Sequence, residues 1–132
     1  MTPQQFVETI YLGDRSITSI TLDVRTNEVK IQIDCISRVR GESWNFYSAE
    51  DLERGSIVLE GIQSFEITPR GALPNDYITN FQAVALNSGM QEFRLDASST
   101  DESGKYFPVS IVVRARSVAL EKRGDTANRI RE

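Results

Sequence analysis

The chain has 132 residues, of which 39% are hydrophobic and 26% are charged, and this composition is typical of one folded domain. Its formal net charge of −4 disfavours nucleic-acid binding, because phosphates repel an acidic surface. The chain has no histidine and one cysteine, Cys35, which excludes histidine-dependent catalysis, a Cys/His zinc site and an internal disulfide. We therefore expect neither a metal nor a cofactor.

The N-terminal segment combines two signals. Thr2 and Pro3 look like a helix start, but the following FVETIYL is rich in β-branched and aromatic residues, and we expect a strand over residues 6–12. The segment lacks the basic-then-apolar pattern of a secretory signal, and no apolar run is long enough to span a bilayer. These observations predict a cytoplasmic protein without a membrane partner.

The stretch IYLGDRSIT places Gly13, Asp14 and Arg15 between two apolar segments. Glycine accepts a positive φ and aspartate bonds its own backbone in turns, so the residue types favour a turn that joins two strands. The alternative is that Asp14 and Arg15 project from the tip of this turn and bind a partner protein.

Period-two alternation is clearest in the next segment, where residues 20–24 and 29–35 each carry apolar residues at every second position. The intervening RTNE predicts a hairpin in which Arg25 faces Glu28. Cys35 continues the apolar face of the second strand and is expected to be a small buried residue rather than a nucleophile. The apolar pairs so predicted are Val24 with Val29, Leu22 with Ile31, and Ile20 with Ile33.

The segment ISRVRGESWNFY contains two candidate sites. Arg38 and Arg40 could present two guanidinium groups to an anion or to a carboxylate on a partner, or they could form a solvated strand edge. Trp44 and Tyr47 could line a ligand groove with Tyr77, or they could belong to the core. Ser48, the acids after it and Gly55 then predict a short helix near residues 49–54.

The second half of the chain predicts further strands. Residues 56–60 and 63–68 are short and β-branched, and residues 77–86 are apolar on both faces, as in an interior strand. Residues 91–98 and 108–118 alternate as a second hairpin, with Glu92 and Asp96 on the outer face opposite Arg114 and Arg116. From residue 121 no apolar period is present, and we expect a flexible tail over 121–132 after a single domain over 1–120.

The strings YLGDR, VKIQIDCISRVR, WNFYSAEDLERGSIVLEGI and LPNDYI resemble those of a family of small uncharacterised bacterial proteins with YLGDR near the N-terminus. The resemblance covers residues 6 to 120 and implies a single domain, but it implies no activity. Small acidic cytoplasmic proteins of this kind are often immunity proteins against bacterial toxins. This association adds the expectation that the partner is a toxin.

We therefore predict a mostly β fold, an antiparallel β-sandwich or strongly curved sheet of about 7–9 strands with one short helix. The alternative is an α+β fold with a helical N-terminus. For function we predict a non-enzymatic protein-binding domain, such as an immunity protein, that acts through Asp14, Arg15, Arg38 and Arg40. The alternative is a small-ligand or carbohydrate-binding module that uses Trp44, Tyr47 and Tyr77.

Overall fold

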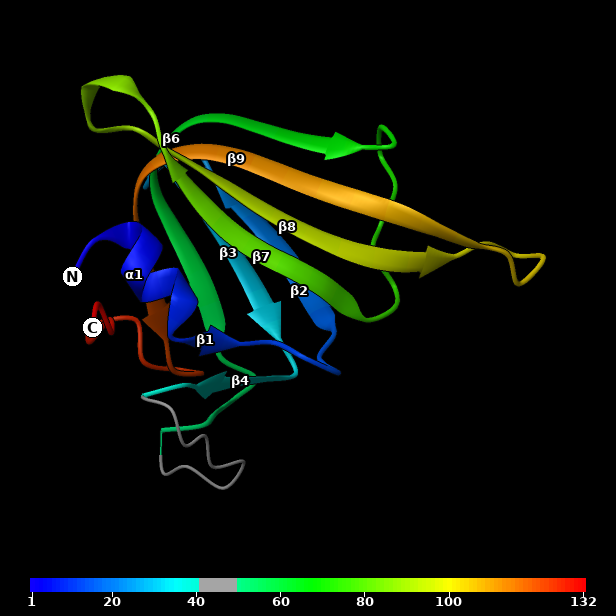
Figure 1. The fold of residues 1–132 in the computed structure, drawn as a ribbon, viewed down its shortest axis with the longest axis horizontal. Helices are drawn as coiled ribbons and strands as arrows, with labels where there is room; N and C mark the ends of the chain where they lie inside the picture. Colours follow the sequence, from blue (N-terminus) through cyan, green and yellow to red (C-terminus); the bar gives the residue numbers. More distant parts are fainter. Residues whose placement is uncertain (41–49) are drawn as a thin grey trace.

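The computed structural model describes residues 1–40 and 50–132, and this part of the chain forms two antiparallel sheets and one short α-helix (Figure 1). The prediction of a mostly β, strongly curved antiparallel fold is confirmed. A three-stranded sheet has the order β1-β4-β5, and a six-stranded sheet has the order β2-β3-β6-β9-β8-β7. The elements are α1 (Pro3–Glu8), β1 (Ile10–Tyr11), β2 (Ile17–Asp23), β3 (Glu28–Ile33), β4 (Cys35–Arg38), β5 (Leu52–Glu53), β6 (Ser56–Thr68), β7 (Ile78–Ala85), the 3-10 turn η1 (Asn87–Gly89), β8 (Gln91–Thr100) and β9 (Tyr106–Glu121).

The two longest strands, β6 and β9, pair along nearly their whole length and bend together (Figure 1). Gly61 has a φ of +68°, and the register shifts between Ile62 and Ser64, so a bulge accompanies the bend. The bend separates a half that contains β2 and β3 from a half that contains β7 and β8, and the β8–β9 hairpin projects beyond the rest of the molecule (Figure 1).

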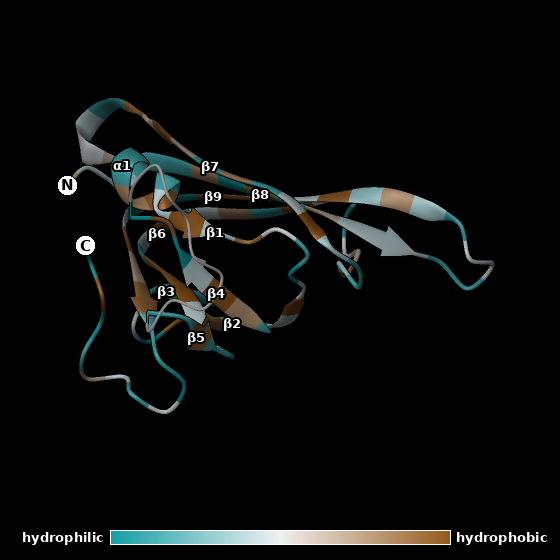
Figure 2. Ribbon diagram, turned by 60° about the horizontal axis from the view of Figure 1, so that its bottom comes forward, coloured by the Kyte–Doolittle hydropathy of each residue, from teal (hydrophilic) through white to brown (hydrophobic). Residues whose placement is uncertain are grey.

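The core lies on one face of the curved sheet, where apolar side chains face each other across neighbouring strands. One such row runs from Ile31 through Ile57 to Leu120, each at most 1% exposed, and another contains Val113 and Phe93, both 1% exposed. Figure 2 shows the resulting change between apolar and polar segments along the strands. The alternation read from the sequence therefore identified the buried face.

The first predicted hairpin forms from β2 and β3, but its register is displaced from the predicted one. Asp23, rather than Arg25, faces Glu28, so four residues form the turn instead of two. The Asp23 carboxylate accepts hydrogen bonds from the backbone N–H groups of Arg25 (3.0 Å) and Thr26 (3.3 Å), which stabilises the wider turn. Leu22 consequently pairs with Val29 rather than Ile31; the displacement is even, so the apolar face is unchanged.

The helix lies at the N-terminus, and two local predictions were wrong. Of the strand predicted over residues 6–12, only residues 10 and 11 form one, β1. Residues 6–8 belong to α1, because Thr2 and Gln5 form a reciprocal capping box and Pro3 starts the helix. Residues 52 and 53 form strand β5 rather than the predicted helix near 49–54, because Leu52 pairs with Ile36 of β4 and is only 5% exposed. Ala49 itself lies outside the described residues.

Three further strand predictions are refined by the tertiary pairing. The segments 56–60 and 63–68 form one continuous strand, β6, because β9 pairs across the bulge. The predicted interior strand 77–86 is β7, an edge strand of the sheet that α1 contacts. Cys35 opens β4 in the smaller sheet instead of continuing β3. The second hairpin is confirmed as β8–β9, and its outer-face pair Glu92–Arg114 forms at 3.4 Å.

The C-terminal segment, for which the sequence predicts a flexible tail, contacts the sheet. Ile130 exchanges two backbone hydrogen bonds of 2.8 Å with Leu120, beyond Ala115, where the pairing of β9 with β8 stops. On the outer face Arg129 forms ion pairs with Glu28 (2.7 Å), Glu60 (2.8 Å) and Glu121 (3.2 Å). The tail is thereby attached to β3, β6 and β9 at once.

Candidate functional site

The predicted turn at Gly13 and Asp14 is present between β1 and β2. Asp14 is exposed and has a φ of +57°, a conformation that aspartate tolerates better than most residues. The backbone N–H of Arg15 donates to the carbonyl of Leu12 (3.1 Å). A Cβ added at Gly13 would overlap the Tyr11 ring, so close approach of that ring explains the glycine.

The side chains of Arg15 and Arg38 point into the protein. Arg15 donates through Nη2 to Oγ of Ser37 (3.0 Å), and Ser37 is fully buried. Arg38 is 3% exposed, donates to Oγ1 of Thr9 (2.9 Å), and lies 5.1 Å from the ring centroid of Phe6. Burial lowers the pKa of Arg38, but a guanidinium remains charged at neutral pH. Both arginines therefore tie the smaller sheet to its surroundings.

Arg40 differs from Arg38 because it lies at the surface, where its side chain is 41% exposed and pairs with Glu50 (2.9 Å). It also donates to the backbone carbonyl of Glu132 (2.9 Å). The hydrogen bonds that Arg40 donates to the Glu50 carboxylate raise the pKa of Arg40 and lower the pKa of Glu50. Arg38 and Arg40 are thus not two guanidinium groups presented together to solvent, and a role of Asp14 or Arg15 in partner binding stays a prediction.

The alternative ligand site is only partly described. Trp44 and Tyr47 lie outside the described residues, and Tyr77 is 56% exposed at the start of β7. The backbone of Tyr77 bridges to Ser16, and the N–H of Ile78 donates to the carbonyl of Arg15 (2.8 Å). This corner joins the start of β7 to the start of β2.

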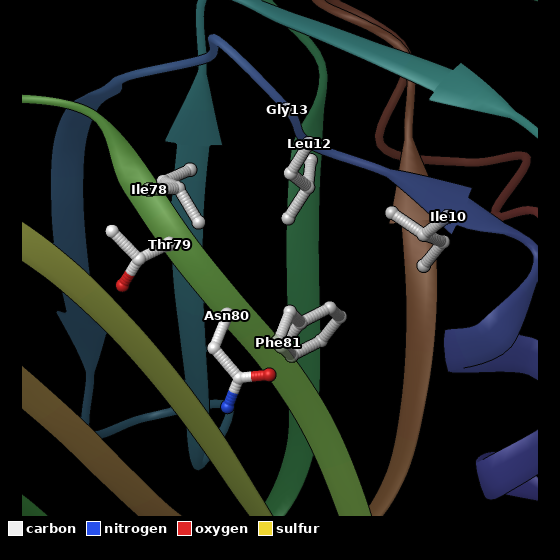
Figure 3. A pocket seen from close by; sticks show the side chains of 7 residues that line it. All are labelled: Ile10, Leu12, Gly13, Ile78, Thr79, Asn80 and Phe81. Carbon is white, nitrogen blue, oxygen red and sulfur yellow. The ribbon is translucent and has the colours of Figure 1, made fainter.

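A small hollow of about 240 Å³ lies beside the same corner, between the β1 segment and β7 (Figure 3). Ile10, Leu12 and Phe81 line it with apolar groups, whereas the amide of Asn80 turns away and donates to the Asp96 carboxylate (3.2 Å). Thr79 likewise donates to the Asp96 carbonyl (3.3 Å). The polar groups that line this hollow therefore serve the β7–β8 pairing.

Two further features bear on chemistry. Burial raises the pKa of the Cys35 thiol, which keeps the thiol protonated and weakly nucleophilic at neutral pH. Among residues 1–40 and 50–132, no cluster of three or more His, Cys, Asp or Glu side chains is arranged to hold a metal ion.

No helix within residues 1–40 and 50–132 is both long and apolar enough to cross a membrane.

The most distinctive surface is one that the sequence analysis did not identify. β2 is an edge strand. Among the described strands it pairs only with β3, apart from the single bridge between Ser16 and Tyr77. Leu22 is 55% exposed and Val24 is 91% exposed at one end of this strand, and Leu73 is 72% exposed near the other end. We call the free side of β2 with Leu22, Val24 and Leu73 the β2 edge.

A hollow of about 550 Å³ adjoins the β2 edge. Consecutive residues of β2, from Ile17 to Ile20, line it on one side, so the hollow lies at the strand's edge rather than on one face. Leu73 and Pro74 line the other side, and Oγ of Ser99 donates to the Leu73 carbonyl (2.8 Å), which holds that loop in place. The sequence ITSITLD predicts a strand with few charges. It does not show that the apolar side chains of this strand are exposed, because their exposure depends on which strands pair.

The whole chain, residues 1–132, matches a family of unknown function, DUF6258, and the protein belongs to this family. No curated protein and no solved structure matches the chain. The function of this family is unknown, so the surface of this chain is what indicates its function.

Proposed function

We propose that this member of the DUF6258 family is a non-enzymatic protein-binding domain and that it binds through the β2 edge. The observation that carries the proposal is an edge strand that, within residues 1–40 and 50–132, pairs along one side only and has exposed apolar side chains. Proteins usually protect such edges with lysine, proline or a covering loop, since a free edge pairs readily with another chain. The sequence of β2, ITSITLD, contains neither lysine nor proline and has a single charge, Asp23.

The binding mode that fits this surface is strand addition. A partner segment in extended conformation would hydrogen bond with the free backbone groups of β2. Its apolar side chains would contact Leu22 at one end and Leu73 beside the hollow at the other. Backbone bonds would supply affinity and the apolar contacts would supply specificity.

A role as an immunity protein belongs to this class of function. Such a protein neutralises a toxin by binding it, and it needs a specific surface rather than catalytic groups. The net charge of −4 favours rapid encounter with a basic partner. The hydrogen bond of Arg15 to buried Ser37 and the burial of Arg38 favour the β2 edge over the guanidinium groups as the contact surface.

Site-specific photocrosslinking in living cells tests the proposal. A photoreactive phenylalanine analogue replaces Leu22 in one protein and Val84 in a control, because Val84 is also exposed (48%) but lies on β7 at the opposite edge of the sheet. We expect a discrete protein adduct from position 22 and none from position 84. Equal adducts at both positions, or none at position 22, would contradict binding through the β2 edge.

A further inference from the structure

We propose that one partner of the β2 edge is a second copy of this chain, bound by antiparallel pairing of β2 with β2 about a two-fold axis at Thr21. The inference rests on the proposed function and specifies the partner of that same surface. It is carried by the placement of the exposed apolar side chains and the hollow at opposite ends of one strand.

The two ends of the β2 edge are complementary to each other. Leu22 and Val24 are 55% and 91% exposed at the C-terminal end. The hollow of about 550 Å³, lined by Ile17, Ile20 and Leu73, lies at the N-terminal end. An antiparallel two-fold axis turns one copy end for end, so it brings the exposed side chains of each copy towards the hollow of the other.

The two-fold axis at Thr21 gives a specific register. Leu22 then faces Ile20 of the second copy, and Val24 faces Thr18 of the second copy beside its hollow. Ser19 faces Asp23 of the second copy, which offers a hydroxyl donor to a carboxylate acceptor. Thr21 faces Thr21, a cross-strand pair that is favourable in antiparallel sheets.

The electrostatics of the strand permit this pairing. Asp23 is the one charge within β2, and it accepts hydrogen bonds from its own turn, chiefly from the backbone of Thr26, which lowers its pKa. No like charges face each other in the register centred on Thr21. The bridge between Ser16 and Tyr77 ends the free edge just before Ile17, so the paired segment is limited to about the length of β2.

A charge exchange at residue 21 tests both the partner and the register. Thr21 is exposed, so Thr21→Lys and Thr21→Glu are expected to fold, and circular dichroism verifies this. In analytical ultracentrifugation over a wide concentration range, we expect the wild-type chain to dimerise. Each variant alone should dimerise about tenfold more weakly or worse, because like charges meet at the axis. An equimolar mixture of the two variants should form a dimer that contains one of each.

Controls separate this result from general effects of charge. Gln82→Lys and Gln82→Glu place the same charges at an exposed position on β7 and should leave the dimer unchanged. Leu73→Asp alters the hollow without touching β2 and should weaken the dimer. A wild-type chain that remains monomeric, a dimer that persists in Thr21→Lys, or a mixture that fails to associate would each overturn the inference.

The crosslinking experiment distinguishes this inference from the proposed function. An adduct at position 22 with twice the mass of the chain supports the second copy. If the wild-type chain is monomeric and position 22 still crosslinks to a different protein, the dimer is wrong and protein binding through the β2 edge stands. If the chain is monomeric and position 22 yields no adduct, both proposals fail.

Discussion

Replacing Arg129 by alanine should destabilise the fold although only three residues follow it in the chain. Its guanidinium contacts Glu28, Glu60 and Glu121 at 2.7, 2.8 and 3.2 Å, and its side chain is 16% exposed. Exposed ion pairs contribute ~0.2–1 kcal/mol each, whereas breaking a buried pair costs ~3–5 kcal/mol. For three partly buried pairs we expect Arg129→Ala to lower the free energy of unfolding by ~2 kcal/mol.

Urea unfolding at neutral pH measures this change, and a melting curve should show a Tm lower by about 6–10 °C for a chain of this size. Arg123→Ala is the matched control, because Arg123 is an exposed residue of the same segment without an ion pair among the described side chains. The control should change the free energy of unfolding by less than ~0.5 kcal/mol.

The effect of Arg129→Ala should also depend on pH. Hydrogen bonds from Arg129 lower the pKa of Glu28, and those from Arg131, Ser117 and Arg129 lower the pKa of Glu60 from 4.5 to about 2 in the folded chain. A carboxyl whose folded pKa is lowered contributes stability above its unfolded pKa and loses it as pH falls towards the folded pKa. The difference between wild type and Arg129→Ala should therefore shrink between about pH 5 and pH 2. A loss below ~0.5 kcal/mol at neutral pH, or one unchanged near pH 2, would refute the reasoning.

Three further predictions concern the fold and its cysteine. Gly61→Val should lower the free energy of unfolding by ~1–3 kcal/mol, because φ at Gly61 is +68° and an added Cβ would lie 3.1 Å from Cβ of Arg116. Urea unfolding measures this change, and an unchanged free energy would contradict the predicted backbone strain. Ser37→Ala should lower the free energy of unfolding by ~1–3 kcal/mol, because Arg15 loses a buried hydrogen-bond acceptor. Thermal unfolding measures this change, and an unchanged Tm would mean that water replaces the hydroxyl. Burial raises the pKa of Cys35, so iodoacetamide should alkylate the native thiol more slowly than the urea-unfolded thiol, and equal rates would disprove its protection.

Much of the local structure followed from the sequence because strand periodicity assigns side chains to faces without reference to partners. The alternation around Val29 and Ile31, and around Phe93 and Leu95, correctly identified two hairpins and their buried faces. The register of the first hairpin was wrong because Asp23 caps a wider turn. The N-terminal helix was missed because its capping box competed with β-rich residues over 6–12.

Residue types and their spacing determined that this chain is a curved antiparallel β domain without histidine chemistry, with a turn at Gly13 and Asp14. The tertiary structure alone decided which charges meet and which apolar side chains stay exposed. Arg129 and Glu28 are 101 residues apart, and no local pattern joins them. Leu22 looks like a core residue in sequence and is 55% exposed because β2 ends the sheet. Alternation reports the face of a strand, whereas exposure depends on the strands packed beside and above it.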